Sequence, residues 1–254
     1  MNSARVNTYF FMTIVLTICL FCSALIGALL IVSTDAGNYN RYQKQLNVYD
    51  YVGVSEEDLR WSQALMASYL QGEDEAMVTL SKTDVSMLCV MQPIFNEKEV
   101  HHMKDVRALF DLARRVLITL LLMSLVTIGM MCIARYTDEH AKREIGWTAY
   151  NHADRNGLIV GLVLLIAVAA FLIYQLQTDF YGTFYVFHEL LFDNDLWLLN
   201  PDTDAMIRMY PQQFFEWIAR DIGLMAAKLL LILAAVPVGL GMYRHIRKRR
   251  AFHA

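Results

Sequence analysis

The sequence predicts an all-α membrane protein with four transmembrane helices and a mainly helical extracytoplasmic domain. Two observations lead to this fold class. Hydrophobic residues make up 56% of the 254 residues and charged residues only 19%. The apolar residues also gather in four long runs, and each run, at about 20 residues, is long enough to cross roughly 30 Å of hydrocarbon as a helix.

The four runs occupy residues 9–32, 116–134, 157–175 and 222–243. The first three contain no charged residue, and the fourth contains only Lys228, which lies near enough to the end of its run for the ammonium group to reach the head-group region. Backbone N–H and C=O groups in lipid must be hydrogen-bonded within the segment, so each run is expected to be a transmembrane helix.

The distribution of charge indicates the orientation. Four spans place residues 1–8, 135–156 and 244–254 on one side of the membrane, and these segments hold ten basic and four acidic residues. The segments on the other side, 33–115 and 176–221, hold 21 of the 25 acidic residues. Because basic residues near the spans favour the cytoplasm, we expect both termini to be cytoplasmic and the two long segments to be extracytoplasmic.

Several other kinds of site are not expected. The basic tail "RHIRKRR" is explained by topology and by attraction to anionic lipids, so no nucleic-acid partner is predicted. The first run is longer than the apolar part of a typical secretion signal and is expected to remain as an uncleaved helix. Cys89 is the one cysteine outside the runs, so no disulfide framework is predicted, and no zinc-finger spacing occurs.

The first extracytoplasmic segment, residues 33–115, carries clear helix signals. In "VSEEDLRWSQALMASYLQG", Ser55 is a predicted N-cap followed by acidic residues, and Gly72 is a predicted stop. The stretch "AMVTLSKTDVSMLCV" that follows is irregular or strand-like, and Pro93 ends it. A second helical pattern starts after the predicted cap Asn96 and continues into the second apolar run, so one long helix is expected to carry "HHMKD".

The second extracytoplasmic segment, residues 176–221, is expected to lie at the membrane interface. Its first part, "FYGTFYVFHELLF", has six aromatic residues among thirteen, a composition that suits rings placed partly in lipid and partly in water. The next part, "DNDLWLLNPDTDAMIRMYPQQFFEW", is rich in Asp, Asn and Pro, so turns and no long element are predicted there. Trp197, Trp217 and the pair Phe214–Phe215 are candidates for anchoring this part at the head-group level.

Two histidines are candidate functional residues. His102 lies on the predicted long helix and His188 in the aromatic segment, and both are expected near the same membrane surface. Three interpretations are open: packed structural histidines, a metal site, and acid–base catalysis. The metal site would use His102 or His101 with Asp105, one helical turn away, and Glu99 or Glu189 would complete it. The metal interpretation is the weakest because no H-E-x-x-H pattern is present, and no bound metal is predicted.

In the catalytic interpretation, the two imidazoles divide the work on an ester at the bilayer surface. One takes a proton from the nucleophile, and the other stabilises the oxyanion or protonates the leaving alcohol. Asp105, one helical turn from His102, is a candidate for orienting an imidazole. No G-x-S-x-G elbow is present and Cys89 is the sole thiol expected outside the membrane, so direct transfer within the substrate is favoured over an acyl-enzyme.

A different class of function is also open from the residues alone, namely a non-enzymatic membrane sensor or scaffold whose extracytoplasmic domain binds a partner. A transporter is disfavoured because the apolar runs hold almost no polar residues to line a path. Arg114 and Arg115 lie at the outer end of the second run, against the positive-inside trend. They are expected either to reach the interface or to face polar groups of a substrate.

Two longer strings resemble the signatures of a bacterial family of integral membrane proteins, the lipoprotein intramolecular transacylases. The strings are "EVHHMKDVRALF", before the second run, and "FHELLFDNDLWLLNPDTDAMIRMYPQQFF", after the third. The resemblance implies an acyltransferase of the bacterial cytoplasmic membrane that acts on diacylglyceryl-modified lipoproteins. It implies that the sn-2 acyl chain moves to the α-amino group of the N-terminal cysteine, giving the lyso form, without a separate donor or cofactor.

The resemblance also implies which residues form the site. His102 and His188 fall on the two histidine positions and are the implied catalytic residues, whereas His101 falls where the family pattern has no histidine. The implied supporting residues are Asp105, Asn194, Trp197, Asn200, Pro201 and Asp204. The implied active site is extracytoplasmic, and the implied partners are lipoproteins and membrane lipid.

Overall fold

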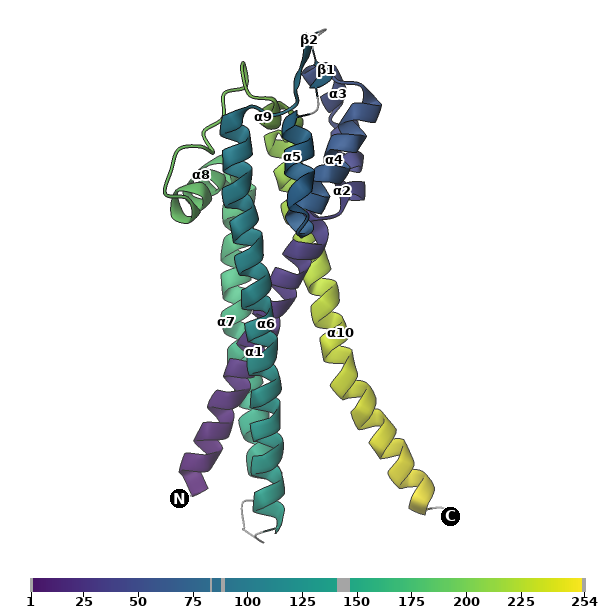
Figure 1. Cartoon of the computed structure of the whole chain (residues 1–254). Coiled ribbons are helices and arrows are strands. Elements are labelled where there is room, and N and C mark those ends of the chain that lie inside the picture. Colours follow the sequence, from purple (N-terminus) through teal and green to yellow (C-terminus); the bar gives the residue numbers. More distant parts are fainter. Residues whose placement is uncertain (1, 83, 88–89, 141–146, 253–254) are drawn as a thin grey trace.

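The computed structural model describes residues 2–82, 84–87, 90–140 and 147–252, with side chains at 6–79, 93–137, 152–233 and 235. The long helices are α1 (Asn2–Ser33), α6 (Glu97–His140), α7 (Trp147–Thr178) and α10 (Gln212–Phe252). Figure 1 shows α1 beginning and α10 ending at the bottom of the molecule, while the shorter elements gather at the top. The chain therefore separates into a bundle of long helices and a compact head.

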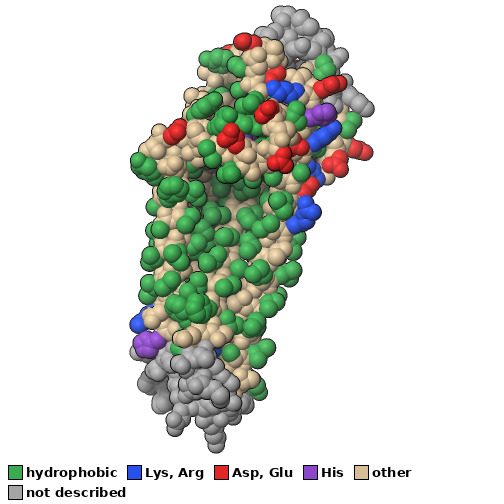
Figure 2. Space-filling view, turned by 90° about the vertical axis from the view of Figure 1, so that its left-hand side faces the viewer, with side chains coloured by type: hydrophobic (Ala, Val, Ile, Leu, Met, Phe, Trp, Pro, Cys, Tyr) green, Lys and Arg blue, Asp and Glu red, His purple; other side chains and the backbone are tan. Residues whose placement is uncertain are grey.

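Three of the long helices, α1, α6 and α7, have the length and composition of membrane spans. Val6–Ser33, Glu97–Thr137 and His152–Thr178 are each long and apolar enough to cross a bilayer, and hydrophobic side chains cover the bundle on the face that Figure 2 shows. These candidate spans contain the first three predicted runs. The fourth predicted run, 222–243, lies on α10, and most of its second half falls outside the residues whose side chains are described.

α1 is the central helix of the bundle, because it contacts α6, α7 and α10. It lies so close to α7 that a Cβ at Gly157 would be 2.8 Å from the carbonyl oxygen of Phe10. Near the same point, Asp154 of α7 pairs with Arg135 of α6 and accepts a hydrogen bond from Thr13 of α1 at 3.2 Å. Close backbone packing and this polar cluster hold the three helices together at the end of the bundle away from the head.

The head comprises the shorter elements together with the upper turns of α6 and α10. These elements are α2 (Ala36–Gln45), α3 (Val48–Val52), α4 (Glu56–Gln71), α5 (Asp74–Lys82), β1 (Asp84–Met87), β2 (Val90–Pro93), α8 (Phe180–Leu191) and α9 (Ala205–Met209). β1 and β2 form an antiparallel hairpin in which Asp84 faces Pro93 and Met87 faces Val90. The prediction of irregular or strand-like structure for residues 76–90 is wrong over its first half, where α5 runs to Lys82, and fits the hairpin that follows. Cys89 lies outside the described residues.

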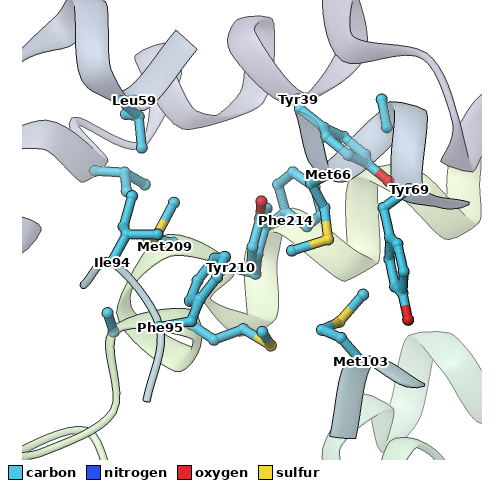
Figure 3. Packing of buried hydrophobic residues seen from close by; sticks show 14 of the residues in the cluster. Tyr39, Leu59, Met66, Tyr69, Ile94, Phe95, Met103, Met209, Tyr210 and Phe214 are labelled. Carbon is cyan, nitrogen blue, oxygen red and sulfur yellow. The ribbon is translucent and has the colours of Figure 1, made fainter. Parts of the chain in front are cut away.

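The head has its own hydrophobic core, shown in Figure 3. The rings of Tyr39, Tyr210 and Phe214 pack together with centroids 5.0 to 6.0 Å apart. Phe214 is only 3% exposed, so this residue belongs to the core and not to the head-group region. The prediction of turns is wrong from Gln212 onward, because α10 begins there and its first turns pack into the head.

Two capping motifs predicted from the sequence are confirmed. At the start of α4, Ser55 Oγ accepts a hydrogen bond from Asp58 N at 3.0 Å, and Gly72 ends this helix with a φ of 138°. At the start of α6, Asn96 Oδ1 accepts from Glu99 N at 3.0 Å, and Glu99 Oε2 accepts from Asn96 N at 2.8 Å. This reciprocal pair is a capping box, and the helix then continues through the second apolar run, as predicted.

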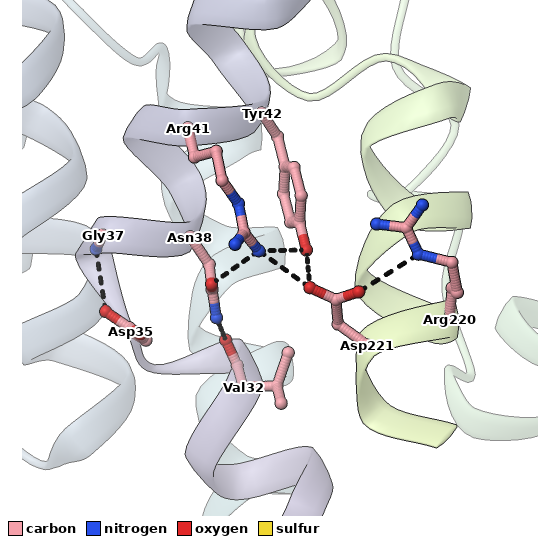
Figure 4. A network of polar contacts seen from close by, with 8 residues as sticks. All are labelled: Val32, Asp35, Gly37, Asn38, Arg41, Tyr42, Arg220 and Asp221. Atoms are coloured by element: carbon pink, nitrogen blue, oxygen red, sulfur yellow. Dashed lines mark hydrogen bonds and ion pairs between the residues drawn. The ribbon is translucent and has the colours of Figure 1, made fainter. Parts of the chain in front are cut away.

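A polar network fixes the head to α10 (Figure 4). Asp221 of α10 accepts hydrogen bonds from Tyr42 and, at 2.8 Å, from Arg41 Nη2, both on α2. The second carboxylate oxygen of Asp221 accepts from Arg220 Nε at 3.1 Å. The contact lies just before the apolar run of α10, so it holds α2 at the junction of the head and the bundle.

Candidate active site

His102 lies on the second turn of α6, and the capping box of Asn96 and Glu99 fixes where this helix begins. The His102 side chain is only 7% exposed, and its Nδ1 atom has no hydrogen-bond partner among the described residues. The neighbouring His101 is exposed, because successive residues of an α-helix point about 100° apart. Only one histidine of the "HH" pair therefore faces the interior of the head.

His188 lies on α8, whose first turn is set by Asp179. The Asp179 carboxylate accepts a hydrogen bond from Gly182 N at 2.9 Å, and a Cβ at position 182 would collide with it. His188 is 7% exposed, and its Nδ1 lies 2.7 Å from the carbonyl oxygen of Phe184. A carbonyl oxygen can only accept, so Nδ1 carries the proton in the neutral ring and Nε2 keeps its lone pair.

The fold brings the two histidines together, which confirms that the bundle is small enough for them to meet. Their ring centroids are 6.2 Å apart. The ring of Phe192 packs against both, at 5.3 Å from His102 and 5.5 Å from His188. The ring of Trp197 lies 4.9 Å from His188, with the two planes inclined by 32°. The pair is thus surrounded by aromatic side chains and shielded from water.

This shielding determines the protonation state of the pair. Burial lowers the pKa of His102 from 6.5 to about 4, the nearby His188 and Lys98 lower it as well, and Asp105 opposes the change. Burial also lowers the pKa of His188, and the hydrogen bond to the Phe184 carbonyl opposes it. Both imidazoles are therefore neutral at pH 7 and able to accept a proton.

The segment between α8 and α9 is fastened along the first turns of α6. Asn194 Nδ2 donates a hydrogen bond to Asp105 Oδ2 at 3.0 Å, and Lys98 Nζ donates to the Leu198 carbonyl oxygen at 2.5 Å. These two contacts hold the chain on both sides of Trp197. Asp105, expected to orient an imidazole, is hydrogen-bonded to Asn194 instead, and it makes no hydrogen bond to either histidine within the described part of the chain.

Asn200 and Asp204 shape the same segment from within. Asn200 Oδ1 accepts from Asp202 N at 3.0 Å, and Asp204 Oδ2 accepts from Asn200 N at 2.8 Å. Asp204 Oδ1 accepts from Thr203 Oγ1 and from Asn96 Nδ2, each at 2.9 Å. Burial raises the pKa of Asp204, but these hydrogen bonds outweigh it and hold the pKa below its ordinary value. Both residues stabilise the turn and join it to α6.

Glu99, which the sequence offers as a possible ligand of the weakly favoured metal site, joins the start of α6 to α9. It is 1% exposed, and beyond its capping role its Oε1 accepts a hydrogen bond from Met206 N at 2.5 Å. Burial raises the pKa of this carboxyl group, and the hydrogen bonds from Met206 and Asn96 oppose the rise. The N-x-x-E spacing predicts the cap, but no local pattern indicates a partner as far along the chain as Met206.

Other residues considered from the sequence do not converge on the pair. Arg114 donates to Asp111 at 2.6 Å and to the Leu70 carbonyl oxygen, so it joins α6 to the end of α4. Arg115 Nε donates to the Asp111 carbonyl oxygen at 3.3 Å. No group of three or more His, Cys, Asp and Glu side chains suited to a metal ion occurs in the part of the chain that is described.

Comparison with known proteins adds a family and a fold. The model of the family described as "Lipoprotein intramolecular transacylase Lit" matches residues 14–215. Among solved structures, the membrane integral lipoprotein intramolecular transacylase Lit of Bacillus cereus has a TM-score of 0.69 and 19% identity, covering 94% of this chain and 99% of that one. No curated protein sequence matches the chain.

Two further structures of the Bacillus cereus protein, each with one histidine substituted, are also similar. The arginine variant has a TM-score of 0.60 at 19% identity, covering 99% of this chain and 97% of that one. The alanine variant has a TM-score of 0.63 at 18% identity, covering 96% and 98%. At such identities the likeness establishes the fold, a multi-pass helical membrane protein.

The family match extends over most of the chain and includes both segments that carry the buried histidines. Membership implies an acyltransferase whose substrates are lipoproteins. The chain belongs to the lipoprotein intramolecular transacylase family.

Proposed function

We propose that the chain transfers the sn-2 acyl chain of a diacylglyceryl-modified lipoprotein to the α-amino group of the same molecule's N-terminal cysteine. The observation that carries this proposal is the pair of buried imidazoles with centroids 6.2 Å apart. His188 follows the end of α7 at Thr178 by ten residues, which suits an ester held at the bilayer surface. The family match supports a lipoprotein as the substrate.

The proposed reaction is the aminolysis of an ester within one molecule. The neutral amine attacks the sn-2 carbonyl carbon, which forms the N–C bond and a tetrahedral oxyanion. Collapse of this intermediate breaks the C–O bond to glycerol, and the proton lost by nitrogen ends on the released glycerol oxygen. An amine and an ester become an amide and a hydroxyl group, so atoms balance without a second substrate. Holding both groups of one substrate together supplies proximity.

His188 is the proposed base. Its Nδ1–H is held by the Phe184 carbonyl oxygen at 2.7 Å, which leaves the Nε2 lone pair to take the proton from the attacking nitrogen. The lowered pKa of His188 keeps this ring neutral before the reaction. The imidazolium that forms can then deliver the same proton to the departing glycerol oxygen.

His102 is the proposed stabiliser of the oxyanion. With a pKa of about 4 the ring is neutral at working pH, and a neutral imidazole N–H can donate a hydrogen bond to an oxygen on which charge develops. Nδ1 of His102 is buried and has no protein partner in the part of the chain described, so its hydrogen-bonding capacity is unused within the protein. The two histidines would then flank one ester carbonyl in different roles.

Mass spectrometry of a defined substrate tests this function. The purified protein would be given a diacylglyceryl lipopeptide with a different fatty acid at sn-1 and at sn-2, mixed with a second lipopeptide of different peptide mass and different chains. The proposal requires the sn-2 chain of each molecule on its own nitrogen, with the sn-1 chain still on glycerol and no crossover between the two peptides.

Other products would indicate a different function. Crossover between the two lipopeptides would mean an intermolecular transfer, and loss of a chain to water would mean a hydrolase. Unchanged lipopeptide, with folded protein and binding of the substrate, would favour the non-enzymatic alternative of a membrane sensor or scaffold.

A further inference from the structure

The imidazole of His188 is packed against aromatic rings from two parts of the chain. Phe184, one turn earlier on α8, has its centroid 4.1 Å away, and Trp197, from the segment after α8, has its centroid 4.9 Å away. The Trp197 plane is inclined to the imidazole plane by 32°, so the two rings are tilted and closer to parallel than to perpendicular. Phe187 and Phe192 lie at 5.3 and 5.5 Å.

The imidazole of His188 has no acidic partner in the described part of the chain. Among the described residues, no carboxylate makes a hydrogen bond or an ion pair with His188 or His102. Two carboxylates of α6 have other partners: Asp105 accepts from Asn194, and Glu99 accepts from the Met206 amide. The arrangement thus differs from a triad, in which a buried aspartate stabilises the charged histidine.

A base in this environment needs another source of charge stabilisation. When His188 accepts a proton it becomes a buried cation, and burial of a charge without compensation is costly. The face of an aromatic ring carries negative potential and attracts a cation within about 6 Å of the ring centroid, and the tryptophan ring does so most strongly. Trp197 meets this distance, with its centroid 4.9 Å from that of His188 and the two planes inclined by 32°.

The position of Trp197 is itself well determined. The ring packs edge-on against Tyr185 of α8 at 5.0 Å. The chain on one side is held by Asn194 on Asp105 at 3.0 Å, and on the other by Lys98 on the Leu198 carbonyl at 2.5 Å. These contacts fix the indole over His188 before a substrate binds, as preorganised catalysis requires.

We infer that Trp197 is a positioning residue that acts through His188: its π face holds the imidazole in place and stabilises the positive charge that this ring acquires during acyl transfer. The inference rests on the proposed function, in which His188 removes the proton from the attacking amine and passes it to the glycerol oxygen. Trp197 takes no part in any bond that forms or breaks. Asp105 and Asn194 then serve to place Trp197, which gives their hydrogen bond a role in the site.

Fluorinated tryptophans separate this electrostatic role from a purely structural one. Successive fluorine atoms withdraw electron density from the ring face while changing the shape of the indole little. The protein would be produced with tryptophan, monofluoro-, difluoro- and tetrafluorotryptophan, and kcat and KM measured on the diacylglyceryl lipopeptide. Because all four tryptophans are replaced, the same series would be made in the W197F background as a matched control.

The expected result is a graded fall of kcat along the series in the otherwise wild-type protein. The fall should reach about 3- to 30-fold at tetrafluorotryptophan, which is the range of cation–π strengths from exposed to desolvated sites. KM should stay constant, because the charge forms only in the transition state. In the W197F background the rate should not depend on fluorination, because neither Trp61 nor Trp217 makes a ring contact with His102 or His188 among the described side chains.

Three results would overturn the inference. An unchanged kcat along the series in an active protein would overturn the inference and leave the proposed function intact. An equal slope in the W197F background would also overturn it, by moving the effect to another tryptophan. No acyl transfer by the unfluorinated, folded protein would overturn the proposed function itself, and the inference with it.

Discussion

Protonation of His102 should destabilise the head as the pH falls. The pKa of this imidazole is about 4 in the folded protein against an ordinary value of 6.5. The unfolded chain therefore binds the proton first, and stability that is fully present above pH 6.5 is lost as the pH falls toward 4. Since one pKa unit corresponds to about 1.4 kcal/mol, the loss between pH 7 and pH 4 is on the order of 3 kcal/mol.

The measurement is thermal unfolding of the detergent-solubilised protein at a series of pH values, followed by tryptophan fluorescence. A loss of this size corresponds to a fall in Tm of about 6 to 12 °C in a chain of this length. The variant H102Q should lack this part of the pH dependence, because glutamine does not titrate. The variant H101Q removes the exposed neighbour and is the matched control that should behave as wild type.

The outcome depends on the difference in pH profile between wild type and H102Q, with H101Q as the control. Carboxylates throughout the protein titrate in the same range, but they do so equally in all three proteins, so only the difference between variants is used. His188 also has a pKa lowered by burial, so some pH dependence should persist in H102Q. Identical pH profiles for wild type and H102Q would refute the claim that His102 is buried in its neutral form.

Three further substitutions test how the site is supported, each by the change in Tm and in acyl-transfer rate. Glu99→Gln leaves one of the two carboxylate oxygens as an acceptor. The free energy of unfolding should fall by about 1 to 3 kcal/mol, because a buried backbone donor or the helix cap loses its partner. A Tm equal to wild type would contradict this. Gly157→Val should disrupt the packing of α1 on α7, because its Cβ would lie 2.8 Å from a backbone oxygen. Gly129→Val is the control and should be tolerated, because nothing lies within 4 Å of the Cβ it would add. An equal Tm for the two variants would show that α1 and α7 do not pack this closely. Asp221→Asn should lower the free energy of unfolding by about 1 kcal/mol or less, because its ion pair is with Arg41, whose side chain is half exposed. A larger loss of stability would contradict this expectation.

The local elements of the structure follow from the sequence because their causes are local. Ser55 and Asn96 start their helices with side-chain oxygens placed three residues before the amide they bind, and such spacings are visible in the chain. The apolar runs are visible for the same reason, since the length of a span depends only on the bilayer. The proximity of His102 and His188 could be expected because both were predicted near the same end of a small bundle.

The connections within the site could not be predicted, because they depend on tertiary structure. Asp105 was assigned to an imidazole on the basis of helical spacing, yet its partner is Asn194, which lies 89 positions away. Glu99 could be considered from the sequence as a helix-cap residue or a metal ligand, but nothing local to it indicates that it binds the Met206 amide. Phe214 was assigned to the interface because aromatic residues favour both environments, and only the early start of α10 places it in the core.

The central claim is that His102 and His188 act as one unit in acyl transfer. The most direct test is a double-mutant cycle on the single-turnover rate with the diacylglyceryl lipopeptide, using H102N, H188N and the double variant at matched folding. Each single change should slow the reaction by about 10²- to 10⁴-fold, and the double variant should be little slower than the worse single variant, because residues that act as a unit are not additive. A wild-type rate in either single variant, or a double variant whose loss is the product of the two, would contradict the account.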